Sequence, residues 1–107
     1  MNRPRLDRSV GQIVRQVVAL ANPQRILLFG SANRGNPRPD SDLDFLVVVD
    51  DAAHPNEILD LLNTGAKRTT RPCDFLVATT KTLRRQRDNP GLIYAQILKE
   101  GQEVYVQ

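Results

Sequence analysis

The sequence predicts a single small α/β (α+β) domain in which helices flank a mixed sheet. A chain of 107 residues has room for one hydrophobic core. Its composition, with 40% hydrophobic and 25% charged residues, is typical of a globular domain. Short apolar runs alternate along the chain with segments whose apolar residues recur at helical spacing. We therefore expect one domain over residues 1–107, in the order helix, strand, strand, helix, strand, two helices, strand.

Periodicity and turn residues predict the extent of each element. The expected helices span residues 6–21, 55–66, 80–87 and 90–100, and the expected strands span residues 25–29, 43–50, 73–78 and 103–106. Asn22-Pro23 ends the first helix, Gly30 closes the first strand at a tight turn, and Gly101 caps the last helix. The apolar stripes of the first two helices, including Ile58, Leu61, Leu62 and Ala66, are expected in the core.

Composition narrows the cellular setting and the kind of ligand. The longest apolar runs, residues 17–21 and 45–49, are far shorter than the roughly 18 residues of a membrane span, and no signal peptide is visible. The single cysteine, Cys73, excludes an internal disulfide, so we expect a cytoplasmic protein. The net charge of +3 is compatible with phosphate-bearing ligands, although a high-GC genome would give the same excess of arginine.

Three aspartates stand at the starts of two expected strands. Asp42 and Asp44 are two residues apart, so strand alternation points both to one face with Cα atoms roughly 6–7 Å apart. Close carboxylates repel, and paired divalent cations relieve that repulsion in phosphoryl chemistry. Hard oxygen ligands favour magnesium. With Asp74 at the start of the next strand, the sequence predicts a Mg²⁺ site of three carboxylates.

The segment that follows the first strand suits phosphate binding. Gly30 allows close approach of the backbone to a ligand, and Ser31 offers a hydroxyl and an amide at a helix start. Arg34, on the same loop, can neutralise charge on departing phosphates. These residues predict a nucleotide-binding loop.

A structural role for the same residues has to be weighed. An isolated Asp-x-Asp pair after Pro39-Asp40-Ser41 is typical of a turn. Gly30-Ser31 alone is an ordinary strand exit, and Asp74 alone could pair with Arg71. Their joint occurrence in this order, each at a strand end, favours a site.

The segment from Leu28 to Gly35, followed by residues 39–44, resembles the signature of the DNA polymerase beta-type nucleotidyltransferases. The short chain and the ten residues between Ser31 and Asp42 are similar to the minimal nucleotidyltransferases, antitoxin partners of HEPN-domain ribonuclease toxins. The likeness extends to the end of the chain, where Ile97 to Gly101 precedes a strand. Asn33 replaces the alanine of many relatives.

This resemblance implies the nucleotidyltransferase fold and a role for each residue. Asp42 and Asp44 would bind both magnesium ions, and Asp74 would ligate the nucleophile-side metal and help to deprotonate the acceptor hydroxyl. Gly30 and Ser31 would hold the triphosphate of ATP while the acceptor attacks the α-phosphate and pyrophosphate leaves. Larger relatives add an acceptor-binding domain, and the 107 residues leave no room for one. A second chain is therefore expected to present the acceptor.

The resemblance implies an enzyme, a protein adenylyltransferase that transfers AMP to a tyrosine of a HEPN toxin within a hetero-oligomer. The protein would then be the antitoxin of a type VII-like toxin–antitoxin pair. One alternative is a catalytic subunit whose small-molecule or RNA acceptor is bound by a separate chain. Another is a non-catalytic module that binds a toxin, or that contacts nucleic acid through its arginines.

Other polar residues receive no catalytic role. His54, the only histidine, precedes a helix start and is expected in a surface turn. Tyr94 and Tyr105 are expected to pack. Arg84, Arg85 and Arg87 form a basic cluster that could contact RNA or an acidic partner.

Overall fold

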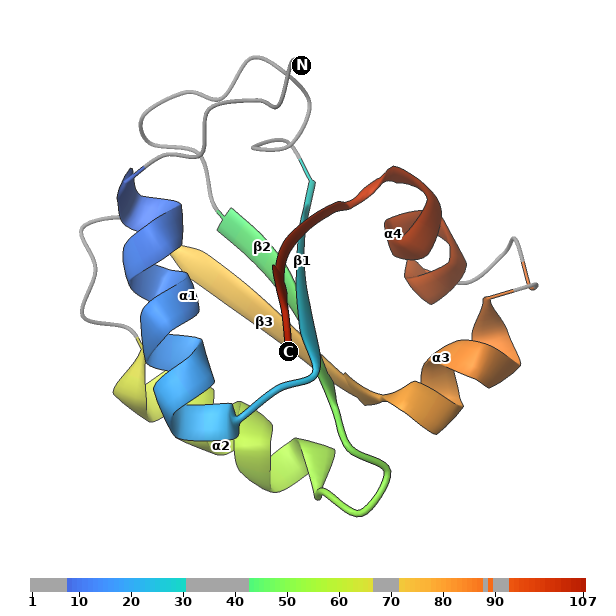
Figure 1. Cartoon of the computed structure of the whole chain (residues 1–107), viewed down its shortest axis with the longest axis horizontal. Helices are drawn as coiled ribbons and strands as arrows, with labels where there is room; N and C mark the ends of the chain where they lie inside the picture. Colours follow the sequence, from blue (N-terminus) through green and yellow to red (C-terminus); the bar gives the residue numbers. More distant parts are fainter. Residues whose placement is uncertain (1–7, 31–42, 67–71, 88, 90–92) are drawn as a thin grey trace.

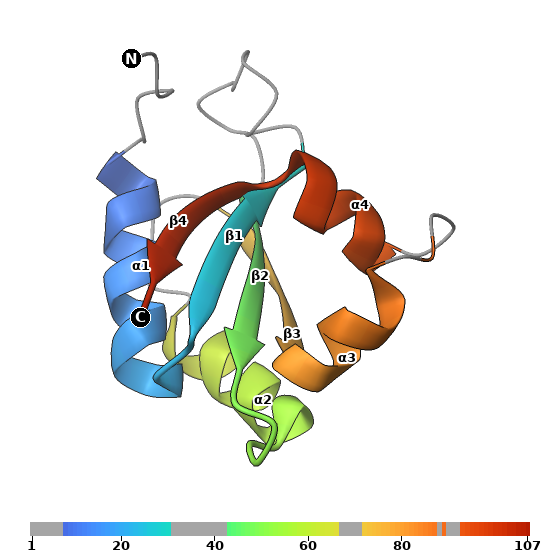
Figure 2. The same ribbon diagram turned by 45° about the vertical axis from the view of Figure 1, so that its right-hand side comes forward.

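A four-stranded sheet lies between two layers of helices in the computed structural model (Figures 1 and 2). The structure describes residues 8–30, 43–66, 72–87, 89 and 93–107. Its elements are α1 (Arg8–Ala21), β1 (Arg25–Phe29), β2 (Leu43–Val49), α2 (Pro55–Gly65), β3 (Cys73–Thr79), α3 (Thr80–Gln86), α4 (Ile93–Glu100) and β4 (Gln102–Val106). Element order and fold class are confirmed. Most boundaries agree with the expectation to within one residue, and residues 6–7 and 90–92 of the expected helices lie outside the described residues.

The sheet is mixed, with strand order β3-β2-β1-β4. β1 pairs antiparallel with both β2 and β4, whereas β2 and β3 run parallel. The register places Leu43 opposite Cys73, and Phe29 opposite Asp44. The end of β1 and the starts of β2 and β3 therefore meet at one edge of the sheet.

Alternation along β2 divides the core between the two faces of the sheet. Leu43, Phe45, Val47 and Val49 pack in a cluster with residues of α1 and α2, such as Ile13 and Leu62. The opposite cluster joins Leu46 and Val48 to Leu83 of α3 and Ile97 of α4. Both sheet faces are covered by helices, as Figure 1 shows, so β2 is a continuous apolar run.

Local hydrogen bonds mark the end of α1 and the start of α3. Asn22, with φ of 45°, follows α1 in the left-handed conformation common after helices, and its N–H donates to the Val18 carbonyl at 3.1 Å. The Thr79 hydroxyl caps α3 by accepting from the Thr82 N–H at 3.1 Å. These contacts set the directions in which the chain enters β1 and leaves β3.

Gly101 allows the close connection between α4 and β4. Its N–H donates to the Ile97 carbonyl at 2.7 Å, and a Cβ at this position would lie only 2.6 Å from that carbonyl oxygen. Because Gly101 has no side chain, β4 can turn back immediately to pair with β1.

The apolar stripe of α2 is narrower than its sequence predicts. Leu62 and Ala66 are fully buried and Ile58 packs against the same cluster, but Leu61 is 43% exposed. The expectation that Leu61 lies in the core is wrong, because adjacent helical residues point about 100° apart and Leu62 faces the sheet. None of the described helices is long and apolar enough to cross a membrane.

Candidate active site

Two of the predicted aspartates lie side by side at the edge where β2 and β3 begin. Asp44 and Asp74 are direct partners in the parallel register. Adjacent strands are about 4.8 Å apart and paired residues project to the same face, so the two side chains leave the sheet next to each other. Asp44 is half-buried and Asp74 is exposed. Asp44 is therefore partly covered by its neighbours, whereas Asp74 is accessible to an incoming molecule.

The face that carries this pair is the one covered by α3 and α4. Asp44 is two residues before Leu46, and Asp74 is two residues before Leu76. Both leucines belong to the cluster on the α3 and α4 side of the sheet. By strand alternation, both aspartates share that face.

Gly30 brings the backbone of the β1 exit against Asp44. Its φ of +81° lies in the region that favours glycine, and Phe29, the residue before it, pairs with Asp44 across the strands. A Cβ on Gly30 would overlap the Oδ2 atom of Asp44 and lie 3.3 Å from its Cγ. The glycine predicted to allow close approach to a ligand thus also makes space for a predicted metal ligand. We call Gly30, Asp44 and Asp74 the carboxylate edge.

The other predicted site residues, Ser31, Arg34 and Asp42, lie outside the described residues. Within the described ranges, no group of three or more histidine, cysteine or acidic side chains could hold a metal ion. The pair that is described nevertheless fits a divalent metal in its chemistry, since it offers hard carboxylate oxygens on adjacent strands. Asp44 and Asp74 are therefore the described residues that could hold a metal.

The residues without an assigned role occupy structural positions. His54 is exposed at the start of α2, where its side chain makes no capping hydrogen bond. Cys73 is buried in the core. Tyr94 packs against the cluster on the α3 and α4 side, and Tyr105 packs against the opposite one. These placements agree with the surface and packing positions expected from the sequence.

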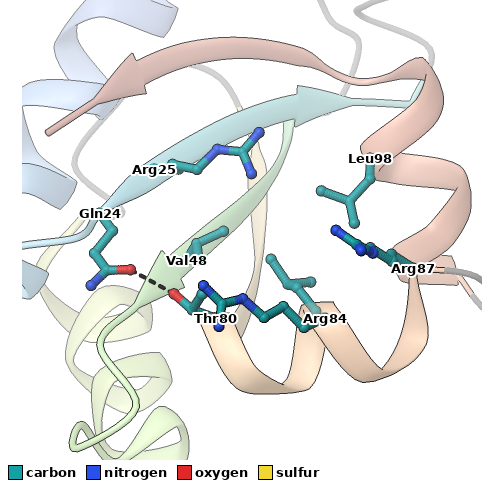
Figure 3. A pocket seen from close by; sticks show the side chains of 8 residues that line it. Gln24, Arg25, Val48, Thr80, Arg84, Arg87 and Leu98 are labelled. Carbon is teal, nitrogen blue, oxygen red and sulfur yellow. Dashed lines mark hydrogen bonds between the residues drawn. The ribbon is translucent and has the colours of Figure 1, made fainter.

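A pocket of about 410 Å³ opens elsewhere on the molecule, between β1, β2, α3 and α4 (Figure 3). It is lined by Gln24, Arg25, Val48, Thr80, Leu83, Arg84, Arg87 and Leu98. Two members of the predicted basic cluster, Arg84 and Arg87, line it, and Arg85 does not. Arg84 and Arg87 are three residues apart, and residues at this spacing lie on the same side of a helix. The sequence could therefore have predicted that these two arginines, without Arg85, face the same way. The contributions of Gln24, Arg25 and Leu98 were not predicted.

The described members of the predicted site therefore lie at the starts of paired strands, beside a glycine turn. Comparison with protein families gives the class of protein: the family described as Polymerase beta, Nucleotidyltransferase matches residues 12–107. The chain belongs to this family. No curated protein and no solved structure matches it. The family membership supports nucleotidyl transfer from a nucleoside triphosphate with a divalent metal as the general chemistry of the domain.

Proposed function

We propose that the protein is a magnesium-dependent adenylyltransferase that moves AMP from ATP to a hydroxyl group of a partner protein. The partner that the resemblance implies is a HEPN-domain toxin, modified on a tyrosine, which makes this chain its antitoxin. One observation carries the catalytic part of the proposal: Asp44 and Asp74 are paired in register beside Gly30. This register supports the proposal, because two carboxylates on adjacent strands can share metal ions that act on one phosphoryl group.

The two described aspartates have different exposures, and we assign them different roles. Asp44, half-buried against the β1 exit, would hold metal together with Asp42. Asp74 is exposed on β3, which among the described strands pairs with β2 alone and so lies at the border of the sheet. An acceptor can reach Asp74 from solvent. Bound magnesium would supply positive charge to the phosphates.

The proposed reaction is an in-line displacement. The acceptor oxygen forms a bond to the α-phosphorus of ATP, the bond from that phosphorus to the bridging oxygen breaks, and pyrophosphate leaves. The proton of the acceptor hydroxyl passes to the Asp74 carboxylate. Gly30, Ser31 and Arg34 would position the triphosphate. The protein contributes orientation and charge neutralisation to this step.

The mass of the partner tests this proposal. The HEPN protein is co-expressed with the wild-type chain, with Asp44→Asn, or with the control Asp60→Asn, and its intact mass is measured. Asp60 is an exposed aspartate of α2, so its substitution makes the same chemical change away from the carboxylate edge. We expect one or more added AMP units with the wild type and the control, and none with Asp44→Asn.

Two results would contradict the proposal. An unchanged partner mass in a stable complex with the wild-type chain would favour a module that acts by binding. Label from ATP that appears in RNA or in a small molecule, with none in the protein, would favour the alternative acceptors.

A further inference from the structure

The pocket shares a sheet face with the carboxylate edge but lies at the other end of β2. Val48, which lines the pocket, is four residues after Asp44 and therefore on the same face by alternation. At about 3.3 Å per residue, the two positions are about 13 Å apart along the strand. A molecule seated in the pocket is therefore on the side of the sheet where the acceptor must approach.

The lining of the pocket combines an aliphatic base with cationic walls. Val48 and Leu83 are buried and Leu98 is partly buried, and all three contribute apolar surface. Arg25, Arg84 and Arg87 supply the only charged side chains among the described residues that line it, as Figure 3 shows for the labelled members. Such a lining suits a ligand that is apolar at its centre and negatively charged around it.

One of these arginines already binds a carboxylate within the chain. The Nε atom of Arg25 donates to Oε2 of Glu103 at 2.6 Å, and both side chains are about two-fifths exposed, at 39% and 41%. The planar guanidinium group matches a carboxylate with two parallel donors. Arg84, on the facing wall, carries the same guanidinium group and could form the same kind of ion pair with a ligand carboxylate.

Hydrogen bonds fix two walls of the pocket relative to each other. The Gln24 N–H donates to the Val48 carbonyl at 2.7 Å, and the Gln24 backbone carbonyl accepts from the Gln107 N–H at 2.9 Å. The side-chain Oε1 of Gln24 accepts from the Thr80 hydroxyl at 2.5 Å, the bond drawn in Figure 3. The Lys81 N–H donates to Asp51, which holds the start of α3 in place. The pocket is thus formed before a ligand binds, which lowers the entropy cost of binding.

We propose that this pocket binds an acidic segment of the acceptor protein, with one leucine-like side chain on the aliphatic base and flanking carboxylates against Arg84 and Arg25. That the segment belongs to the acceptor protein rests on the proposed function. That the segment is acidic and carries an aliphatic side chain rests on the lining of the pocket alone. None of the described lining residues is aromatic. Sites for single-stranded nucleic acid typically stack bases on aromatic side chains, so the lining favours a peptide over RNA.

Binding of short peptides to the full chain, followed by backbone amide NMR shifts, tests the proposal without a catalytic step. The probe is an acetylated Glu-Glu-Leu-Glu-Glu peptide at physiological ionic strength, and the control is the same peptide with serine in place of leucine. We expect saturable shifts at the amides of Thr80, Leu83 and Arg84. The serine peptide should bind about tenfold more weakly, because it buries no aliphatic side chain.

A pair of neighbouring charge reversals tests which arginine matters. Arg84→Glu should weaken the leucine peptide about tenfold, since it removes a guanidinium from the pocket wall. Arg85→Glu changes the net charge equally on the same helix but outside the lining, and it should change affinity by no more than about twofold.

Three results would overturn the inference. They are the absence of saturable shifts, equal effects of the two charge reversals, and tighter binding of a short oligouridine than of the leucine peptide at the same amides. Failure of these tests, with AMP transfer still dependent on Asp44, would remove the docking site and leave the proposed function intact.

Discussion

The two ends of one sheet face carry opposite charge and are built in different ways. At one end, the carboxylate edge is assembled by strand register and a single glycine turn, from residues that follow or begin strands. At the other end, the pocket lined by Arg25, Arg84 and Arg87 draws its side chains from β1, β2, α3 and α4 and from the residues that precede β1 and follow α3. The first end can be specified by a short motif, whereas the second depends on how α3 and α4 pack on the sheet.

The separation of these two regions allows chemistry and recognition to be tested apart. About 13 Å of β2 lies between Asp44 and Val48, and no residue belongs to both regions. We infer that catalytic defects and docking defects fall on different sets of residues.

The largest expected effect belongs to the carboxylate edge. Asp44→Asn should lower the rate of nucleotidyl transfer by about a hundredfold to a thousandfold, because it removes a charge that the transfer site needs. Transfer to the purified partner is measured with labelled ATP, and circular dichroism checks that the fold is retained. Asp60→Asn is the matched control. Equal rates for the two variants would place the reaction elsewhere.

A pair of glycine substitutions tests the close contact at the same edge. Gly30→Ala should lower the free energy of unfolding by about 1–3 kcal/mol, since alanine resists a positive φ and its Cβ would overlap the Asp44 carboxylate. Gly11→Ala, in α1, has no atom within 4 Å of the added Cβ and should stabilise the protein by about 0.5–1 kcal/mol. Urea denaturation measures both. Similar stabilities for the two variants would contradict the crowding at Gly30.

The hydrogen bond between the walls of the pocket has a smaller effect. Thr80→Val removes the donor to Gln24 and should cost about 1 kcal/mol of unfolding free energy. Thr64→Val also removes a hydroxyl, but one that is exposed and bonded to carbonyls of its own helix, so it should change stability by less than about 0.5 kcal/mol. Thermal unfolding compares the two. A larger loss for Thr64→Val would show that the Gln24 contact does not hold the pocket together.

The smallest effect is expected at the exposed ion pair of the pocket. Glu103→Gln should change stability by less than about 1 kcal/mol, because exposed pairs contribute little. It should tighten binding of the Glu-Glu-Leu-Glu-Glu peptide by about twofold to fivefold, since Arg25 is released for the ligand. Peptide titration measures this gain. Weaker binding would show that Glu103 holds Arg25 in its binding position.

The sequence predicted most of the fold because each element has a strong local signal. Valine-rich β2 and the helical spacing of α1 needed no tertiary information. Leu61 was wrongly predicted to be buried, because periodicity predicts a wide apolar stripe and only part of that stripe packs against the sheet. The parallel direction of the pairing that joins Asp44 to Asp74 was not predicted, since strand direction is a property of the whole topology.

The two regions also differ in how much of them could be predicted. Gly30, Asp44 and Asp74 were identified from spacing at strand ends, and the structure brings them together. Gln24 and Thr80 are 56 residues apart in sequence, and no local pattern connects them. Their contact depends on how α3 packs on the sheet, which propensity and periodicity do not specify.

The most direct test of the central claim is to map where magnesium and a non-hydrolysable ATP analogue bind, using the backbone amide NMR shifts of the full chain. We predict that the amides of Gly30, Asp44 and Asp74 shift together, that the amide of Arg84 does not, and that Asp44→Asn abolishes the change. Shifts at Arg84 that persist in Asp44→Asn, with none at the carboxylate edge, would contradict the assignment of nucleotidyl transfer to that edge.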